Sequence, residues 1–486
     1  MTSNADMSND TGTSSVSWRE VLTRQHGPAL ILVCMGVWLH AAESLLVATM
    51  MPAIVADIGG AEQVAWTIAL YEIGTIVAGA AGGLLALRHG IRLPMGSAAL
   101  AYAAGSAIAA LAPSMEVLLL GRVLQGLGGG GLMALAFIAV GVLFPKRLTA
   151  RVMAAITTLW GVSSLFGPLI GGLFVELSTW RNGFWFFTLQ ALVLALWIGV
   201  GVKLKERPLD ERAGQRLPIR RLLFLASGIM LIAYAGIDIQ VIRTSALIFA
   251  GLVCLCIFLW LDGRGEDNRL LPRRPFSLTA PASAALTMIL CFAAATVAIV
   301  AYGPLLMTSL HGISALSAGY IIAAASVSWT LAAVIVSGAG EQHDSKCIAT
   351  GMLLISASIV GFCYAIPYGP VWLIVVFAIV QGVGFGLAWT FTLRQATSLV
   401  AADDKARIAG ALPTAQRLGY ALGAAVIGVV ANAAGFADAV DRADTERAGM
   451  IIFVSCLPIA ALGLFAMFRF VSAKRPDAPA AMLTGT

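Results

Sequence analysis

The stretch GVSSLFGPLIGG, residues 161–172, lies inside a run that is otherwise apolar enough to cross a membrane. Glycine and proline weaken an isolated helix, yet this stretch is rich in them. It contains Gly161, Gly167, Pro168, Gly171 and Gly172. Small residues at 163, 167 and 171 repeat every four positions and form a strip along which another helix can approach closely. Such a strip suits a contact that closes in one state and separates in another, although an ordinary packing seam uses the same residues.

The composition around this stretch indicates an integral membrane protein. Of 486 residues, 59% are hydrophobic and 12% are charged, about half the charged share of a soluble domain. A helix needs about 20 apolar residues to cross a bilayer of about 30 Å, and fourteen runs qualify. The expected spans are 29–51, 64–87, 93–112, 116–143, 152–177, 184–202, 221–237, 243–262, 279–307, 317–338, 347–366, 370–397, 408–434 and 448–472. The predicted fold class is therefore an all-α membrane protein.

The basic residues predict the orientation. Most of the 31 Lys and Arg residues fall in the tails and in the loops on the same side as the tails, and cytoplasmic loops carry such an excess. Both termini are therefore expected in the cytoplasm, with the chain in a plasma membrane of the bacterial inner type. The net charge of +6 is explained by these loops and does not indicate nucleic acid binding.

The order of spans predicts two similar bundles with a late-added hairpin between them. The expected parts are a cytoplasmic tail at 1–28, a six-helix bundle at 29–202, a linker at 203–220, an inserted hairpin at 221–262, a linker at 263–278, a second six-helix bundle at 279–472 and a cytoplasmic tail at 473–486. The seven cysteines are scattered and odd in number, so neither a disulfide framework nor a zinc site is indicated.

Three charged residues lie well inside the spans, where each costs about 2.5–3.5 kcal/mol on insertion scales. Glu43, Glu72 and Arg122 are expected about 9–12 Å below the outer surface, at 1.5 Å per residue, so they could meet in one layer. Burial favours the neutral form of a carboxylate and an arginine favours the ionised form, so changing water access could load or release a proton. The alternative is a structural ion pair that only fixes helix packing.

Other polar groups in the spans have open roles. His40 precedes Glu43 by three residues on the same helix face, so it either relays protons or forms a simple hydrogen bond between helices. Arg417 has no acidic partner in its own helix. It is expected either to attract an anionic group of a substrate or to donate to backbone carbonyls.

Four motifs together resemble the drug/proton antiporters of the major facilitator superfamily, in particular the fourteen-helix branch. GVSSLFGPLIGG is similar to the fifth-helix motif, LLLGRVLQGLGGG (118–130) to the fourth-helix motif, GGLLALRHGIRLP (82–94) to the loop motif and ESLLVATMMP (43–52) to the first-helix motif. The sequence LLPRRPF (270–276) precedes the seventh core helix of this arrangement. The resemblance covers nearly the whole chain.

The resemblance implies a proton-coupled exporter of lipophilic or amphipathic small molecules, which works by alternating access without a chemical step. It links Arg122 to proton transfer and matches Glu43 to the first-helix acid, and the buried charge of Glu72 adds this residue to the expected proton-coupling set. The expected substrate cavity contains His40, Gln125 and Arg417. The implied gating residues are Arg88, Gly90, Arg92, Gly167, Pro168, Gly171 and Gly172. The coupling ion is the proton and no cofactor is expected. Membrane lipid is the expected surrounding partner, and the sequence is compatible with a monomer without determining the oligomeric state.

Two departures from the family pattern keep alternatives open. Glu43 replaces the usual aspartate, and Leu87 stands where the loop motif usually has an aspartate. The alternatives are an exporter of one physiological substrate, such as a lipid or siderophore, and a receptor or scaffold without transport. ATP drive is not expected, because no GxxxxGK[ST] loop is present.

Overall fold

The computed structural model describes residues 18–24, 26–201, 218–265 and 269–473, and all regular elements in these ranges are helices. The all-α membrane prediction is confirmed. The predicted linker at 203–220 and both predicted tails lie largely outside the described residues.

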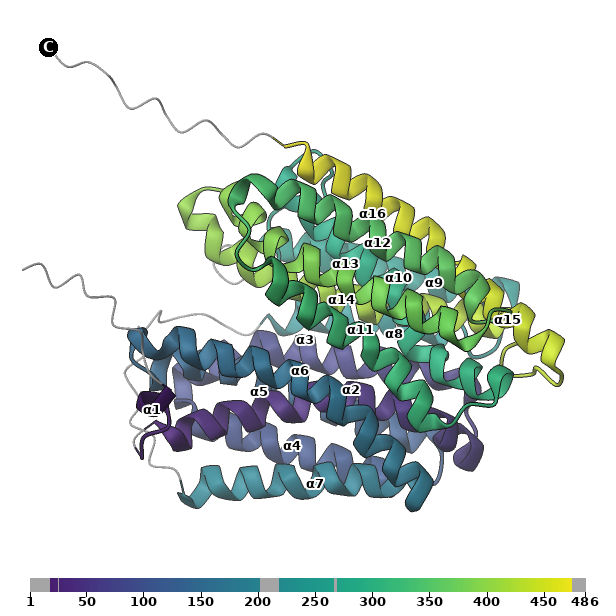
Figure 1. The fold of residues 1–486 in the computed structure, drawn as a ribbon, viewed down its shortest axis with the longest axis horizontal. Coiled ribbons are helices and arrows are strands. Elements are labelled where there is room, and N and C mark those ends of the chain that lie inside the picture. The colour runs from purple at the N-terminus through teal and green to yellow at the C-terminus, as the bar shows by residue number, and fades with distance from the viewer. Residues whose placement is uncertain (1–17, 25, 202–217, 266–268, 474–486) are drawn as a thin grey trace, which may run out of the picture.

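Two bundles of long helices form the body of the protein (Figure 1). The first contains α2 (Gly27–Ile58), α3 (Val64–His89), α4 (Arg92–Ala110), α5 (Met115–Leu143), α6 (Lys146–Leu177) and α7 (Trp180–Leu196), after a short α1 (Trp18–Val21). The second contains α10 (Pro281–His311), α11 (Ala315–Val336), α12 (Asp344–Ala365), α13 (Val371–Ser398), α14 (Ala402–Ala433), α15 (Arg442–Val454) and α16 (Cys456–Val471). The predicted span 448–472 is therefore two consecutive helices, with a break at Ser455.

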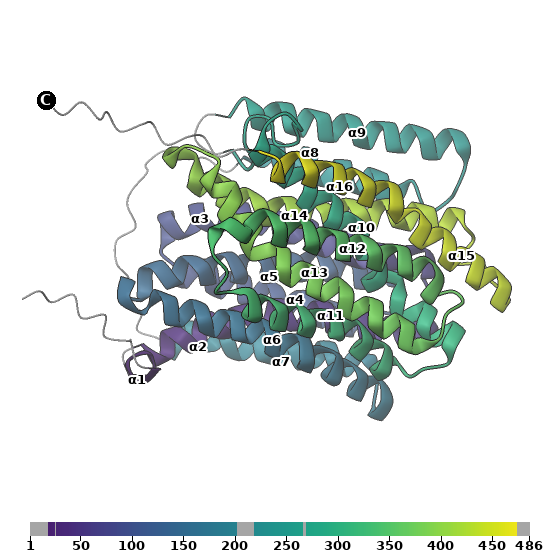
Figure 2. The same cartoon turned by 45° about the horizontal axis from the view of Figure 1, so that its top comes forward.

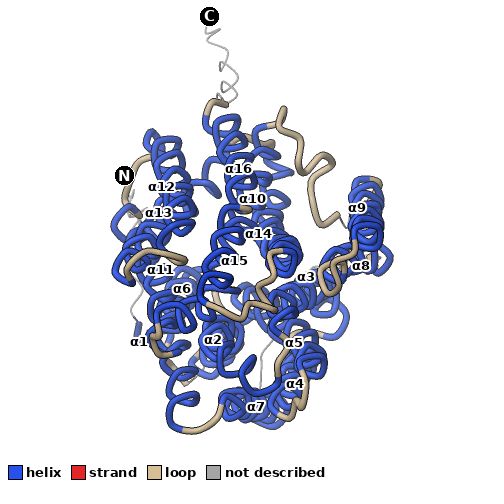
Figure 3. Tube along the Cα trace, turned by 90° about the vertical axis from the view of Figure 1, so that its right-hand side faces the viewer, coloured by secondary structure: helices blue, strands red, loops and turns tan. Residues whose placement is uncertain are grey.

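The inserted hairpin consists of α8 (Ile219–Tyr234) and α9 (Val241–Gly263). Figures 2 and 3 place α9 at the edge of the molecule, with α8 between it and the bundles. At the base of the hairpin, the Asp262 carboxylate pairs with Arg221 and accepts hydrogen bonds from the backbone of Leu270 and Leu271. These bonds join the hairpin to the segment that leads into the second bundle.

Among the described residues, thirteen helices are long and apolar enough to span a membrane. The fourteenth predicted span corresponds to α8, which has 16 residues and is shorter than a typical span. The count of fourteen therefore stays a prediction that depends on α8.

One end of the molecule contains the beginning of α2 and the end of α16, and we call it the tail end. We call the opposite end the far end, and the two bundles contact each other toward it. Figure 1 shows the bundles diverging toward the tail end. At the far end, Asn432 of α14 donates to the backbone carbonyl of Glu62, at 2.8 Å, in the short helix η1 (Ala61–Gln63) that precedes α3. The structure therefore has its bundles closed together at the far end.

Candidate functional site

The centre of the first bundle holds a buried ion pair between Glu43 of α2 and Arg122 of α5. Their side chains are only 1% and 3% exposed. Both partners belong to one bundle, so a movement of one bundle against the other leaves this pair intact. The sequence predicted that these two residues lie in one layer, and the structure brings them into contact.

The Arg122 guanidinium has further partners within the same bundle. Its Nε donates to the Thr67 carbonyl at 3.0 Å, and its Nη1 donates to Gln125 Oε1 at 3.0 Å. Gln125 in turn donates to Ser106 Oγ at 2.9 Å and is fully buried. Gln125 was predicted to line a substrate cavity, but in this structure it orients Arg122 instead.

A second ion pair joins the two bundles. Arg417 of α14 donates to both carboxylate oxygens of Glu72 in α3, at 3.0 and 3.2 Å. The Arg417 side chain is 22% exposed and that of Glu72 is 8% exposed. From the sequence, Glu72 was expected in one layer with Arg122, and a substrate anion or backbone carbonyls were the expected partners of Arg417. The structure corrects the expectation for Arg417, because its partner is Glu72.

His40 connects the two ion pairs. Its Nε2 lies 2.7 Å from Arg417 Nη2, and its Nδ1 lies 2.8 Å from the Tyr71 hydroxyl. A guanidinium has only donors, so Nε2 accepts, Nδ1 carries the hydrogen and Tyr71 accepts from it. His40 is therefore neutral in this arrangement. The Tyr71 ring also lies under Arg122, at 4.5 Å from the guanidinium carbon to the ring centroid.

The glycine-rich stretch of α6 contacts two different helices. A Cβ added at Gly167 would lie 2.9 Å from the Ala42 carbonyl oxygen, and one added at Gly171 would lie 3.0 Å from the Leu46 carbonyl oxygen. Both carbonyls belong to α2 of the same bundle. A Cβ at Gly172 would lie 2.5 Å from Leu316 Cδ1, in α11 of the other bundle. Gly167 and Gly171 therefore pack within their own bundle, as in the packing-seam alternative, whereas Gly172 contacts the other bundle.

Pro168 takes part in the contact between bundles with Gly172. A Cβ added at Gly319 of α11 would lie 3.0 Å from Pro168 Cβ and 2.3 Å from Thr49 Oγ1. Helices α2, α6 and α11 thus meet closely at this point, where a larger side chain would separate them.

The predicted gating loop between α3 and α4 contacts its own bundle. Arg92 Nε donates to the Ile198 carbonyl at 2.9 Å, and its Nη2 donates to the Gly199 carbonyl. These carbonyls belong to a π-helical turn, Trp197–Gly201, that ends α7. Gly90 has a φ of +70°, which favours glycine. Arg88 lies in the last turn of α3. The gating role of Arg88, Gly90 and Arg92 stays a prediction.

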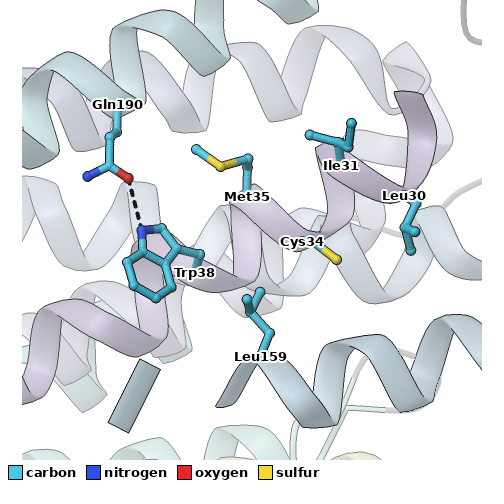
Figure 4. A pocket seen from close by; sticks show the side chains of 7 residues that line it. All are labelled: Leu30, Ile31, Cys34, Met35, Trp38, Leu159 and Gln190. Atoms are coloured by element: carbon cyan, nitrogen blue, oxygen red, sulfur yellow. Dashed lines mark hydrogen bonds between the residues drawn. The ribbon is translucent and has the colours of Figure 1, made fainter. Parts of the chain in front are cut away.

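A separate pocket of about 410 Å³ lies between α2, α6 and α7. Figure 4 shows its lining, which is apolar except for Gln190 and the indole nitrogen of Trp38. The indole nitrogen of Trp38 donates a hydrogen bond to Gln190 Oε1 at 2.9 Å. The full lining is Leu30, Ile31, Cys34, Met35, Trp38, Leu159 and Gln190. The pocket therefore suits an apolar occupant.

Sequence reasoning missed Tyr71 and Trp160. Tyr71 connects His40 with Arg122, and the Trp160 ring meets the His40 ring edge-on at 6.0 Å. Tyr71 directly precedes Glu72, and an aromatic hydroxyl beside a buried acid was the available signal. All seven cysteines are free, and no three metal-ligating side chains gather in the part of the chain that the structure describes.

Comparison with known proteins agrees with this arrangement. A family model of the Major Facilitator Superfamily matches residues 32–424. A probable multidrug-efflux transporter of Mycobacterium tuberculosis is 29% identical over 472 residues, which cover 95% of this chain and 98% of the relative. Multidrug resistance protein 3 of Bacillus subtilis is 26% identical over 379 residues, which cover 75% of this chain and 71% of the relative.

Solved structures show the same fold at low sequence identity. A bacterial homolog of the human lysosomal transporter Spinster, in an inward-facing and unoccupied conformation, superposes with a TM-score of 0.63 at 15% identity, over 94% of this chain and 100% of that one. The nucleoside transporter NupG superposes with a TM-score of 0.60 at 14% identity, over 91% and 100% of the two chains. At these identities the likeness concerns the fold alone.

Proposed function

Because the chain belongs to the major facilitator superfamily, we propose that it is a proton-coupled antiporter that exports lipophilic or amphipathic compounds by alternating access. Its relatives named as multidrug-efflux transporters support a small-molecule substrate. We also propose that it works in a bacterial-type inner membrane with both termini in the cytoplasm, which the excess of basic residues on that side supports.

The observation that carries the proposal is the pair of buried carboxylates, Glu43 and Glu72, each against an arginine in the middle of the helices. Charges at this depth are costly and mark ion or proton pathways in many transporters. The proton is the proposed coupling ion, because a carboxylate takes up or releases it in place of an arginine contact. No cofactor is part of the proposal.

The pocket between α2, α6 and α7 favours one alternative substrate. Its apolar lining suits an acyl chain as well as a drug, so export of a physiological lipid is the second candidate. Labelled lipids and cationic dyes, tested side by side in the same vesicles, distinguish the two. A lipid exporter moves the lipid and leaves the dyes in place.

Proteoliposomes test the proposal. An imposed pH gradient is expected to drive dye accumulation against its concentration gradient, and a protonophore is expected to abolish it. Replacing both Glu43 and Glu72 by glutamine is expected to abolish accumulation. Dye movement that is indifferent to the pH gradient in the unmodified protein contradicts proton coupling, and complete absence of movement favours a receptor or scaffold.

A further inference from the structure

The two ion pairs differ in whether their partners belong to the same bundle. Glu43 and Arg122 both lie in the first bundle, whereas Glu72 and Arg417 come from different bundles. Alternating access moves one bundle against the other. The first pair therefore persists through such a movement, and only the second has to break and re-form.

The Glu72–Arg417 pair lies on the seam between α3 and α14, and the same seam is closed at the far end. There, a Cβ added at Gly428 of α14 would lie 3.0 Å from Ala65 Cβ of α3, and Asn432 reaches the Glu62 carbonyl. Opening the far end along this seam draws α14 away from α3, and with it Arg417 away from Glu72.

Departure of Arg417 leaves three acceptor atoms without their donor. These are both carboxylate oxygens of Glu72 and the Nε2 of His40. A buried carboxylate without a cation is costly, and binding one proton removes that cost. One proton therefore replaces one arginine in the open arrangement.

The second arginine and the two tyrosines near Glu72 do not take over this role. Arg122 is already paired with Glu43, and Tyr71 accepts from His40. Tyr420 of α14 lies one turn from Arg417 and contacts Gln416, so it moves with α14. Among the described groups facing Glu72, Arg417 is the cation that changes place when the bundles move.

We propose that Arg417 is the positioning residue that ties proton binding at Glu72 to the contact between the bundles, by leaving Glu72 when the far end opens and returning when it closes. This inference rests on the proposed function and assigns the coupling proton to Glu72 rather than Glu43. Glu72 takes a proton while the far end is open, and the returning Arg417 expels it toward the tail end. With the tail end in the cytoplasm, one proton enters in each export cycle.

The test measures the distance between the bundles at the far end. Spin labels are introduced with unnatural amino acids at Ala56 of α2 and Ser317 of α11, which are both exposed, so the native cysteines stay in place. Distances are measured on the full-length protein in lipid nanodiscs at pH 8 and pH 5. The unmodified protein is expected to show short distances at pH 8 and a larger long-distance population at pH 5.

Two variants remove the pair and one restores it. Glu72→Gln and Arg417→Gln are each expected to raise the ratio of long to short distances at pH 8 at least about fivefold, which corresponds to about 1 kcal/mol. Both are expected to lose the pH response. Arg417→Lys keeps a cation and is expected to recover it. The matched control is Arg394→Gln, which breaks a pair with Asp344 between α12 and α13 of the second bundle and is expected to leave the distances unchanged.

The inference is overturned if Arg417→Gln keeps the distances and pH response of the unmodified protein, or if Arg417→Lys behaves like Arg417→Gln. Transport is measured separately in proteoliposomes, where Arg417→Gln is expected to retain downhill flux and lose uphill accumulation. If distances respond as expected but no pH gradient drives transport in the unmodified protein, the proposed function fails while the role of Arg417 stands. If a pH gradient drives transport in the unmodified protein but the distances do not respond as expected, only the role of Arg417 is rejected.

Discussion

At the residue scale, the two glutamates lie in different surroundings although both pair with arginine. Glu43 and Arg122 are sealed inside one bundle, and Arg122 has additional partners in Thr67 and Gln125. Arg417 is partly exposed between the bundles. The first pair lies within one bundle, whereas the second joins helices of different bundles.

This difference predicts unequal effects on stability. Glu43→Gln leaves Arg122 charged and buried without an anion, and breaking a buried pair costs about 3–5 kcal/mol. Glu72→Gln is expected to cost clearly less, because the partly exposed Arg417 can turn toward water. Thermal unfolding of the purified variants in detergent checks the order, and equal losses of stability would contradict it.

Gln125 offers a second prediction at this scale. Gln125→Leu removes the donor to Ser106 Oγ and one of the two acceptors of Arg122 Nη1, which keeps Glu43. A buried polar group left without a partner costs about 1–3 kcal/mol. Gln190→Leu is the matched control, since it removes one hydrogen bond to Trp38 beside an apolar pocket. Thermal unfolding is expected to show the larger loss for Gln125→Leu. A larger loss for Gln190→Leu would show that Gln125 does not hold Arg122.

The sequence predicted these residues better than their pairing. Glu43, Glu72, Arg122 and Arg417 were recognisable because charge inside an apolar span is costly. The Glu72–Arg417 contact was not predictable, because the partners are 345 residues apart and meet only through the rotation of α3 and α14 about their own axes. The length and hydropathy of a span do not determine that rotation.

At the element scale, α6 presents two different faces from one short motif. Gly167 and Gly171 let α2 approach within the bundle, while Pro168 and Gly172 meet α11 of the other bundle. The four-residue spacing predicted a close helix contact correctly. It could not show which neighbour occupies it, because adjacent glycines point about 100° apart around a helix of 3.6 residues per turn.

Adjacent substitutions in this motif are expected to have different consequences. Gly172→Ala places a methyl group 2.5 Å from Leu316 Cδ1, so the far end is expected to close less often and the long-distance population between Ala56 and Ser317 to rise. Gly171→Ala meets the Leu46 carbonyl at 3.0 Å inside the bundle and is expected to lower the unfolding temperature instead. If both variants change only stability, the division of the motif between two contacts is wrong.

At the scale of the whole molecule, the inserted hairpin takes part in the far-end contact. The Asn432 amide donates to the Glu62 carbonyl of the first bundle at 2.8 Å and to the Gly236 carbonyl after α8 at 2.9 Å. Helix α9 of the same hairpin lies at the edge of the molecule (Figure 3). One side chain of the second bundle therefore joins all three parts of the protein.

This junction predicts that Asn432 stabilises the closed far end. Asn432→Ala removes one donor shared by two carbonyls, and a net hydrogen bond is worth about 0.5–1.5 kcal/mol. The ratio of long to short distances between labels at Ala56 and Ser317 is therefore expected to rise several-fold, because the bond to Glu62 exists only while the bundles touch. Asn182→Ala is the matched control, since Asn182 donates to Ser178 near the same end but within the first bundle. If Asn432→Ala and the unmodified protein have equal distance distributions, Asn432 does not stabilise the closed far end. The α6–α11 contact and the Glu72–Arg417 pair would then hold it closed.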